Sequence, residues 1–138
     1  MRQIFVDTSA WDALADGGDP NHEVALLFRD EIAGQCRLVV TNYILDELYT
    51  LLLMNVRYQR AVDFKRKLDV LVQEGILEVI WVSEAVATEA WAVFEQFNVD
   101  KKWSFTDCVS YVVMKQRGIT EAFAFDDDFA QMGFVCQP

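Results

Sequence analysis

The amino-acid sequence predicts an α/β fold in which a mainly parallel central sheet carries helices on both faces. Short apolar runs alternate along the chain with longer segments in which apolar residues recur every three to four positions. Strands and helices that alternate in this way form parallel sheets. The 138 residues, 53% of them hydrophobic, suffice for one core and contain no linker rich in Pro, Gly or Ser. We therefore expect one domain over residues 1–138.

The predicted strands are five short apolar runs. They cover residues 4–6, 38–40, 77–82 and 122–125, with residues 134–135 as a fifth strand at an edge. Helical periodicity between them predicts helices over residues 10–16, 21–34, 42–56, 59–74, 84–97 and 105–117. Within residues 59–74 one apolar stripe is formed by Ala61, Phe64, Leu68 and Leu71. Gly75 and Gly118 follow two of the helices and are expected C-caps.

The charge and cysteine content limit the class of protein. Twelve basic and 22 acidic residues give a net charge of −10, which argues against a broad basic surface for nucleic acid but not against a nuclease whose carboxylates hold cations. No apolar run is long enough to span a membrane, and the first is too short for a signal peptide. Three cysteines without metal-ligand spacing indicate reduced thiols and a cytoplasmic location, and argue against a structural zinc site.

The first unusual carboxylate is Asp7, which directly follows the first apolar run. Asp7, or the hydroxyl of Thr8 or Ser9, is a suitable N-cap for the following helix. Alternatively, the first strand delivers the Asp7 carboxylate to the edge of the sheet where ligands bind in parallel α/β folds. Both interpretations stay open at this point.

A second acid interrupts the apolar stripe of the helix predicted over residues 42–56. Glu47 lies three residues after Ile44 and next to Leu48, whereas Asp46 points about 100° away toward solvent. A buried charge is costly unless it is paired or bound to a metal. Glu47 is therefore either one member of an internal ion pair or a metal ligand.

Further acids lie at the start of the last long helix and after the fourth strand. Ser104 and Asp107 have the spacing of a capping box, although the helix that follows is apolar enough for Asp107 to face inward. Asp126, Asp127 and Asp128 occupy one sharp turn, where three carboxylates repel one another unless a cation or a helix N-terminus relieves them. A turn followed by a helix cap explains Asp128 better than Asp126.

Carboxylates from separate segments that meet at one sheet edge would bind Mg²⁺ or Mn²⁺, because hard cations prefer oxygen ligands. Such ions promote phosphodiester hydrolysis. A phosphotransfer domain of the receiver or phosphatase type also gathers acids at a sheet edge, but it requires a lysine after a late strand, and none follows residues 122–125 here.

Four segments together resemble the PIN-domain family, especially the VapC-type toxin ribonucleases of toxin–antitoxin pairs, and the resemblance extends over essentially the whole chain. The segments are residues 4–9 (IFVDTS), 41–48 (TNYILDEL), 104–108 (SFTDC) and 124–129 (AFDDDF), the last followed by Gly133 and Phe134. No segment is specific alone, but their order and separation are.

The resemblance implies a small 5′-nuclease-like fold with an acidic pocket that holds Mg²⁺ or Mn²⁺. The family's four acids match Asp7, Glu47, Asp107 and Asp126, which with the hydroxyl residue Thr8 (or Ser9) are the expected catalytic residues. Asp128 matches a variable, sometimes acidic position and is a further expected metal ligand. Ala124 stands where the family often has Thr.

In function, the resemblance implies a metal-dependent endoribonuclease that hydrolyses RNA phosphodiester bonds as the toxin of a pair. A small antitoxin protein and a homodimer are the implied partners, with the apolar residues 43–54 as one source of dimer contacts. Alternatives on the same fold are a non-catalytic binding module and a housekeeping RNA-processing nuclease.

Basic residues provide two candidate contact regions. The first consists of Arg57, Arg60, Lys65, Arg66 and Lys67, which form either a mixed-charge surface with Asp63 and Asp69 or a strip for RNA phosphates or an acidic partner segment. The second is Lys101 and Lys102, which lie closer in sequence to the Asp107 segment. The neighbouring Trp103 either stacks on a base or packs in the core.

Overall fold

A five-stranded, entirely parallel sheet forms the centre of the protein. The computed structural model describes residues 1–138, and its strands lie in the order β3-β2-β1-β4-β5. The strands are β1 (Gln3–Val6), β2 (Arg37–Thr41), β3 (Leu77–Ile80), β4 (Glu121–Phe123) and β5 (Val135–Gln137). The parallel sheet predicted from the sequence is therefore confirmed.

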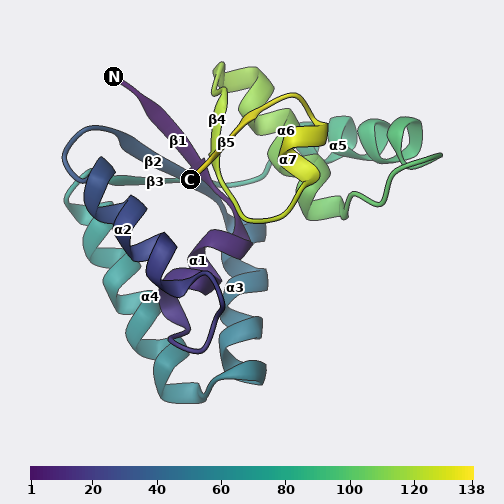
Figure 1. The fold of residues 1–138 in the computed structure, drawn as a ribbon. Coiled ribbons are helices and arrows are strands. Elements are labelled where there is room, and N and C mark those ends of the chain that lie inside the picture. Colours follow the sequence, from purple (N-terminus) through teal and green to yellow (C-terminus); the bar gives the residue numbers. More distant parts are fainter.

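Seven helices connect the strands and cover both faces of the sheet. They are α1 (Thr8–Ala15), α2 (His22–Ile32), α3 (Asn42–Asn55), α4 (Tyr58–Gln73), α5 (Glu84–Phe97), α6 (Phe105–Arg117) and α7 (Asp128–Gln131). Figure 1 shows α1 to α4 gathered on one side and α5 to α7 on the other. All six predicted helices are present, and only the four-residue α7, too short to show periodicity, was missed.

The position of β1 beside β4 determines where a site can form. From β1 the chain moves outward through β2 to β3, then crosses back to β4 and continues to β5 on the other side. The amide of Asp7 donates to the carbonyl of Phe123 over 3.0 Å and so extends the β1–β4 pairing beyond β1. The carboxyl ends of these two strands meet where the strand order reverses, which is the usual place for ligands in open parallel sheets.

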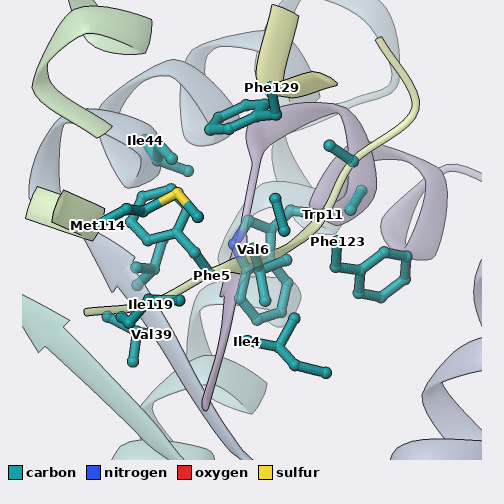
Figure 2. Packing of buried hydrophobic residues seen from close by; sticks show 14 of the residues in the cluster. Ile4, Phe5, Val6, Trp11, Val39, Ile44, Met114, Ile119, Phe123 and Phe129 are labelled. Atoms are coloured by element: carbon teal, nitrogen blue, oxygen red, sulfur yellow. The ribbon is translucent and has the colours of Figure 1, made fainter. Parts of the chain in front are cut away.

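Buried apolar side chains hold the two helical layers against the sheet. Figure 2 shows Phe129 of α7 above Phe5 of β1, and the centroids of these two rings lie 6.1 Å apart. On the other face, the ring of Phe28 from α2 meets that of Phe123 edge to face at 4.8 Å. The core therefore continues to the edge at which β1 and β4 end.

Two glycines follow helices, one of them as the predicted C-cap, whereas the C-cap of α4 is Glu74. Gly118 is the C-cap of α6 with φ of 66°, and Gly75 follows α4 with φ of 74°. Both backbones lie in the left-handed region, which a residue without a Cβ adopts at little cost. No helix is both long and apolar enough to cross a membrane.

Adjacent residues of α2 provide a test of this packing. Phe28 is 5% exposed against the sheet, whereas Leu27 is 70% exposed. We expect Phe28→Ala to lower the free energy of unfolding by about 3–5 kcal/mol, because it leaves a cavity beside Phe123. Leu27→Ala, the matched control, should change it by less than about 0.5 kcal/mol. Chemical denaturation measures both, and equal effects would show that α2 does not pack as described.

Candidate active site

Four aspartates meet at the carboxyl edge of β1 and β4. Asp7 follows β1 and is 4% exposed, and Asp126 lies in the turn after β4. Asp107 is in the first turn of α6, and Asp128 begins α7. Asp7 interacts electrostatically with both Asp126 and Asp107, and Asp107 interacts with Asp126 and Asp128. The fold thus brings together carboxylates from three separate parts of the chain.

Asp7 is both a helix cap and a member of this acidic group. It is the N-cap of α1, where its Oδ2 accepts hydrogen bonds from the backbone N–H of Ser9 at 3.3 Å and from the Ser9 hydroxyl at 2.7 Å. The two interpretations of Asp7 are therefore compatible. Burial, followed by the charge of Asp126, raises the pKa of Asp7 well above the ordinary aspartate value.

Asp7 and Asp126 form one carboxyl pair. Their side chains share a hydrogen bond that favours the protonated form of Asp7 and the ionised form of Asp126. Burial of its carboxyl group nevertheless raises the pKa of Asp126, although the residue as a whole is exposed. In the metal-free protein this pair therefore retains protons to a higher pH than two isolated aspartates would.

Asp107 and Asp128 form a second carboxyl pair. Asp107 completes the predicted capping box: its amide donates to Ser104 Oγ at 3.0 Å, and its Oδ2 accepts from the Ser104 amide at 3.2 Å. Burial, followed by a hydrogen bond with Asp128, raises the pKa of Asp107 to about 7. A substantial fraction of Asp107 is therefore protonated at neutral pH without a cation.

The turn over residues 126–128 differs from the prediction in which aspartate side chain accepts a backbone hydrogen bond. The sequence favours Asp128 as the capping residue, but the side chain of Asp126 satisfies the turn instead, since its Oδ1 accepts from the Asp128 amide at 3.2 Å. Asp127 is the N-cap of α7 and makes no side-chain cap. The short turn thereby leaves the Asp128 carboxylate facing Asp107.

Glu47 contacts the site through a hydroxyl. Thr8 Oγ1 donates to Glu47 Oε1 at 2.8 Å and joins α3 to the start of α1. Glu47 is half-buried beside the buried Leu48, whereas Asp46 is exposed, as predicted. No Lys or Arg pairs with Glu47, so the internal ion pair considered from the sequence is wrong.

The donor set fits a hard divalent cation. None of the five acids forms a salt bridge with Lys or Arg, so their charge is not compensated by the protein. All available ligand atoms are carboxylate oxygens, which suit Mg²⁺ and Mn²⁺. The side chains do not form a closed cage, because no three acids, His or Cys are grouped tightly enough to hold an ion as they stand. The acids are arranged as two pairs with Glu47 beside them.

Trp103 is not available to stack on a base. It is 3% exposed, and its Nε1 donates to Gln131 Oε1 of α7 at 3.0 Å. Asn98 holds the same residue through two hydrogen bonds with its backbone, at 2.8 and 2.9 Å. The base-stacking interpretation is therefore wrong. These contacts connect the segment before Asp107 to α7, the helix that Asp128 begins. The spacing of Trp103 and Gln131 in the sequence does not reveal this connection.

The basic residues of α4 mostly pair within the fold. Lys65 forms a salt bridge with Asp69 at 2.7 Å, and Arg66 with Asp63 at 3.7 Å, which confirms the mixed-charge interpretation for these residues. Arg60 donates to the carbonyl of Ala15. Of the second region, Lys101 pairs with Asp100 at 3.3 Å, and Lys102 is exposed.

Comparison with known proteins gives relatives over nearly the whole chain. The chain is 34% identical over 133 residues to the 23S rRNA-specific endonuclease VapC20 of Mycobacterium tuberculosis, an alignment that covers 96% of this chain and 95% of that protein. It is 33% identical over 94 residues to a VapC ribonuclease of Archaeoglobus fulgidus, which covers 68% of this chain and 56% of that protein.

Solved structures share the fold. The crystal structure of M. tuberculosis VapC20, a Sarcin-Ricin loop cleaving toxin, matches with a TM-score of 0.82 at 32% identity over 96% of both chains. VapBC2 from Rickettsia felis, bound to promoter DNA, matches with a TM-score of 0.67 at 12% identity over 98% and 97% of the two chains. FitAcB from Neisseria gonorrhoeae matches with a TM-score of 0.63 at 15% identity over 98% of this chain and 96% of that chain. Residues 4–135 match the PIN domain, and the chain belongs to the PIN-domain family.

Proposed function

We propose that this protein is an endoribonuclease that hydrolyses RNA phosphodiester bonds with the help of Mg²⁺ or Mn²⁺ and acts as the toxin of a toxin–antitoxin pair. The observation that carries the proposal is the meeting of Asp7, Asp107, Asp126 and Asp128 at the end of β1 and β4 without a basic partner. Carboxylates that repel one another in a partly buried place favour a bound cation. The named relatives that span most of the chain are ribonucleases.

The acids would have two different roles in the site. Asp7, Asp107 and Asp126 would hold the cation, with Asp128 as a further ligand. When bound, the ion supplies positive charge at the phosphate and activates water for hydrolysis. Glu47 lies beside Asp7 through the hydroxyl of Thr8 and would orient or deprotonate water at the same edge.

RNA is the substrate class supported by the relatives. VapC20 is named for 23S rRNA, and its alignment leaves little of either chain uncovered. A structured ribosomal RNA loop is therefore the first substrate to test. The presence of every acid expected of the family disfavours the non-catalytic binding module, while a housekeeping nuclease would retain the same site.

A groove between α2 and α4 is a candidate surface for an antitoxin. A cavity of about 580 Å³ is lined by apolar side chains of α1, α2 and α4, with Arg29, Arg60 and Lys67 among its polar residues. In a chain with a net charge of −10, these cations suit an apolar segment that carries acidic residues. Because the groove beside them is apolar, an acidic partner segment is favoured over RNA phosphates as the partner of Arg60 and Lys67.

A homodimer and a cytoplasmic location remain our predictions. The inward face of α3 is used by the core, because Ile44, Leu48 and Leu52 are fully buried. Dimer contacts from this helix would therefore have to come from Leu53 and Met54, which are 51% and 75% exposed. The three cysteines are unpaired, as suits a reducing compartment.

Substitution of Asp7 tests the proposed chemistry. Asn caps helices about as well as Asp, so Asp7→Asn should retain the fold. It removes a charge that would hold the cation, and cleavage of a ribosomal RNA loop in Mn²⁺ should fall by orders of magnitude. Asp46→Asn is the control, since Asp46 is exposed one residue from Glu47 and should leave cleavage near the wild-type rate. Wild-type cleavage by folded Asp7→Asn would refute the metal site.

A rise in pH should destabilise the metal-free protein, whereas a bound metal ion should stabilise it. The pKa values of Asp7, Asp107 and Asp126 are raised by folding, so the folded state binds these protons more tightly than the unfolded state. The stabilisation that results is present at low pH and is lost as pH rises from about 4 toward about 7. Metal-free protein should therefore lose melting temperature over this interval, and Asp107→Asn should lose less.

The same carboxylates bind the cation only when they are ionised. At neutral pH, Mn²⁺ or Mg²⁺ at about 100 times its Kd should stabilise the fold by about 2.7 kcal/mol, and the gain should disappear as the pH falls toward about 4. Thermal melts with and without metal measure both effects. A melting temperature unaffected by millimolar Mn²⁺ and Mg²⁺ would contradict the proposed cation site.

Expression in growing cells distinguishes a toxin from a housekeeping nuclease. The toxin role predicts that the wild-type chain slows growth when expressed without a partner, and that Asp7→Asn at the same level does not. Co-expression with the protein encoded by a small adjacent gene should restore growth. Harmless accumulation of folded wild-type protein that cleaves RNA in vitro would favour the housekeeping role.

A further inference from the structure

The hydroxyl group of Ser9 connects the two strands that supply the Asp7–Asp126 pair. Ser9 Oγ donates to Asp7 Oδ2 at 2.7 Å and accepts a hydrogen bond from the backbone N–H of Phe125 at 3.0 Å. Phe125 immediately precedes Asp126, so one side chain contacts both the first acid and the segment that carries its partner. Both hydrogen bonds are partly buried, which limits the replacement of either by water.

No other group in the protein accepts a hydrogen bond from the Phe125 amide. The Phe125 amide has no backbone acceptor, because the ladder between β4 and β5 ends with the bond from the Ala124 amide to the Gln137 carbonyl at 3.1 Å. Ala124 itself is buried and has no hydroxyl. The neighbouring Thr8 hydroxyl is directed to Glu47 instead. Ser9 is therefore the one side chain that binds the backbone directly before Asp126 to the start of α1, beside the hydrogen bond between the Asp7 and Asp126 side chains.

The bonds to Ser9 also determine which oxygen of Asp7 is occupied. The amide and the hydroxyl of Ser9 both donate to Oδ2, at 3.3 and 2.7 Å. Oδ1 is thus the carboxylate oxygen without a donor from this turn. An oriented carboxylate loses less rotational freedom when it takes a cation than a freely rotating one does.

We propose that Ser9 is a positioning residue for the cation: its hydroxyl fixes the orientation of Asp7 and the distance between the Asp7 and Asp126 backbones. This inference rests on the proposed function, because it assigns Ser9 a role toward the same cation. It goes beyond helix capping, since the Ser9 amide alone would satisfy Asp7 as the N-cap of α1.

The test is the affinity of the full-length, metal-free protein for Mn²⁺, measured by calorimetric titration, for wild type, Ser9→Ala and Ser9→Thr. Loss of an outer residue that orients a ligand weakens metal binding about 10- to 100-fold, and we expect Ser9→Ala to fall in this range. Ser9→Thr retains the hydroxyl and should restore most of the affinity. The metal-free melting temperature of each variant is recorded in parallel.

Ser110→Ala is the matched control. Ser110 is fully buried, and its hydroxyl donates to the Thr106 carbonyl within α6 at 3.0 Å, so the variant also removes one buried hydroxyl bond. It should lower the melting temperature without changing the Mn²⁺ affinity. If Ser9→Ala does the same, Ser9 is merely structural and the inference is overturned.

Two further outcomes are decided by the same titrations. If Ser9→Ala does not fold, Ser9→Cys, which retains the volume but hydrogen-bonds weakly, takes its place, and wild-type affinity in that variant overturns the inference. If the wild-type protein itself does not bind Mn²⁺, the proposed function fails together with the role of Ser9. Wild-type binding with unchanged variants overturns the role of Ser9 alone.

Discussion

Repulsion between carboxylates at one edge of the sheet is the constraint on which the rest of the site depends. Asp7 and Asp126 lie together where β1 and β4 end, Asp107 and Asp128 lie beside them, and no Lys or Arg neutralises any of the four. Without a cation, the protein relieves this repulsion by retaining protons. A divalent ion would relieve it at neutral pH, so one arrangement accounts for both the raised pKa values and the proposed chemistry.

The topology explains why the acids meet at this edge. The strand order reverses between β1 and β4, so the connections that follow these two strands leave toward opposite faces of the sheet. The core anchors this edge, since Phe5 of β1 packs against Phe129 of α7, directly after Asp128. The apolar packing thereby holds in place charges that would otherwise move apart.

Local sequence patterns predict the helices, the strands and the acidic residues of the site, but they do not predict the tertiary contacts of these residues. Short apolar runs identify every strand, helical periodicity identifies every long helix, and the out-of-place carboxylates predict which residues reach the edge of the sheet. Whether Glu47 pairs with a cation or a hydroxyl depends on Thr8, which is distant in sequence and meets it only through the packing of α1 on α3. The buried Trp103 likewise finds its hydrogen-bond acceptor in Gln131 of the short α7, an element without a periodic signal. Tertiary contacts, absent from any local pattern, decide such cases.

Two of the acids combine helix capping with a place in the proposed cation site. Asp7 caps α1 and Asp107 completes the capping box of α6, so backbone N–H groups donate to carboxylates that also face other acids. These hydrogen bonds favour the ionised form and partly oppose the effect of burial, and the pKa of Asp107 is about 7 as a result. A helix N-terminus is therefore a means of placing a negative charge in a partly buried site. Because the cap requires only an oxygen acceptor whereas a cation requires charge, Asn can replace Asp7 as the cap of α1 but not in the proposed cation site.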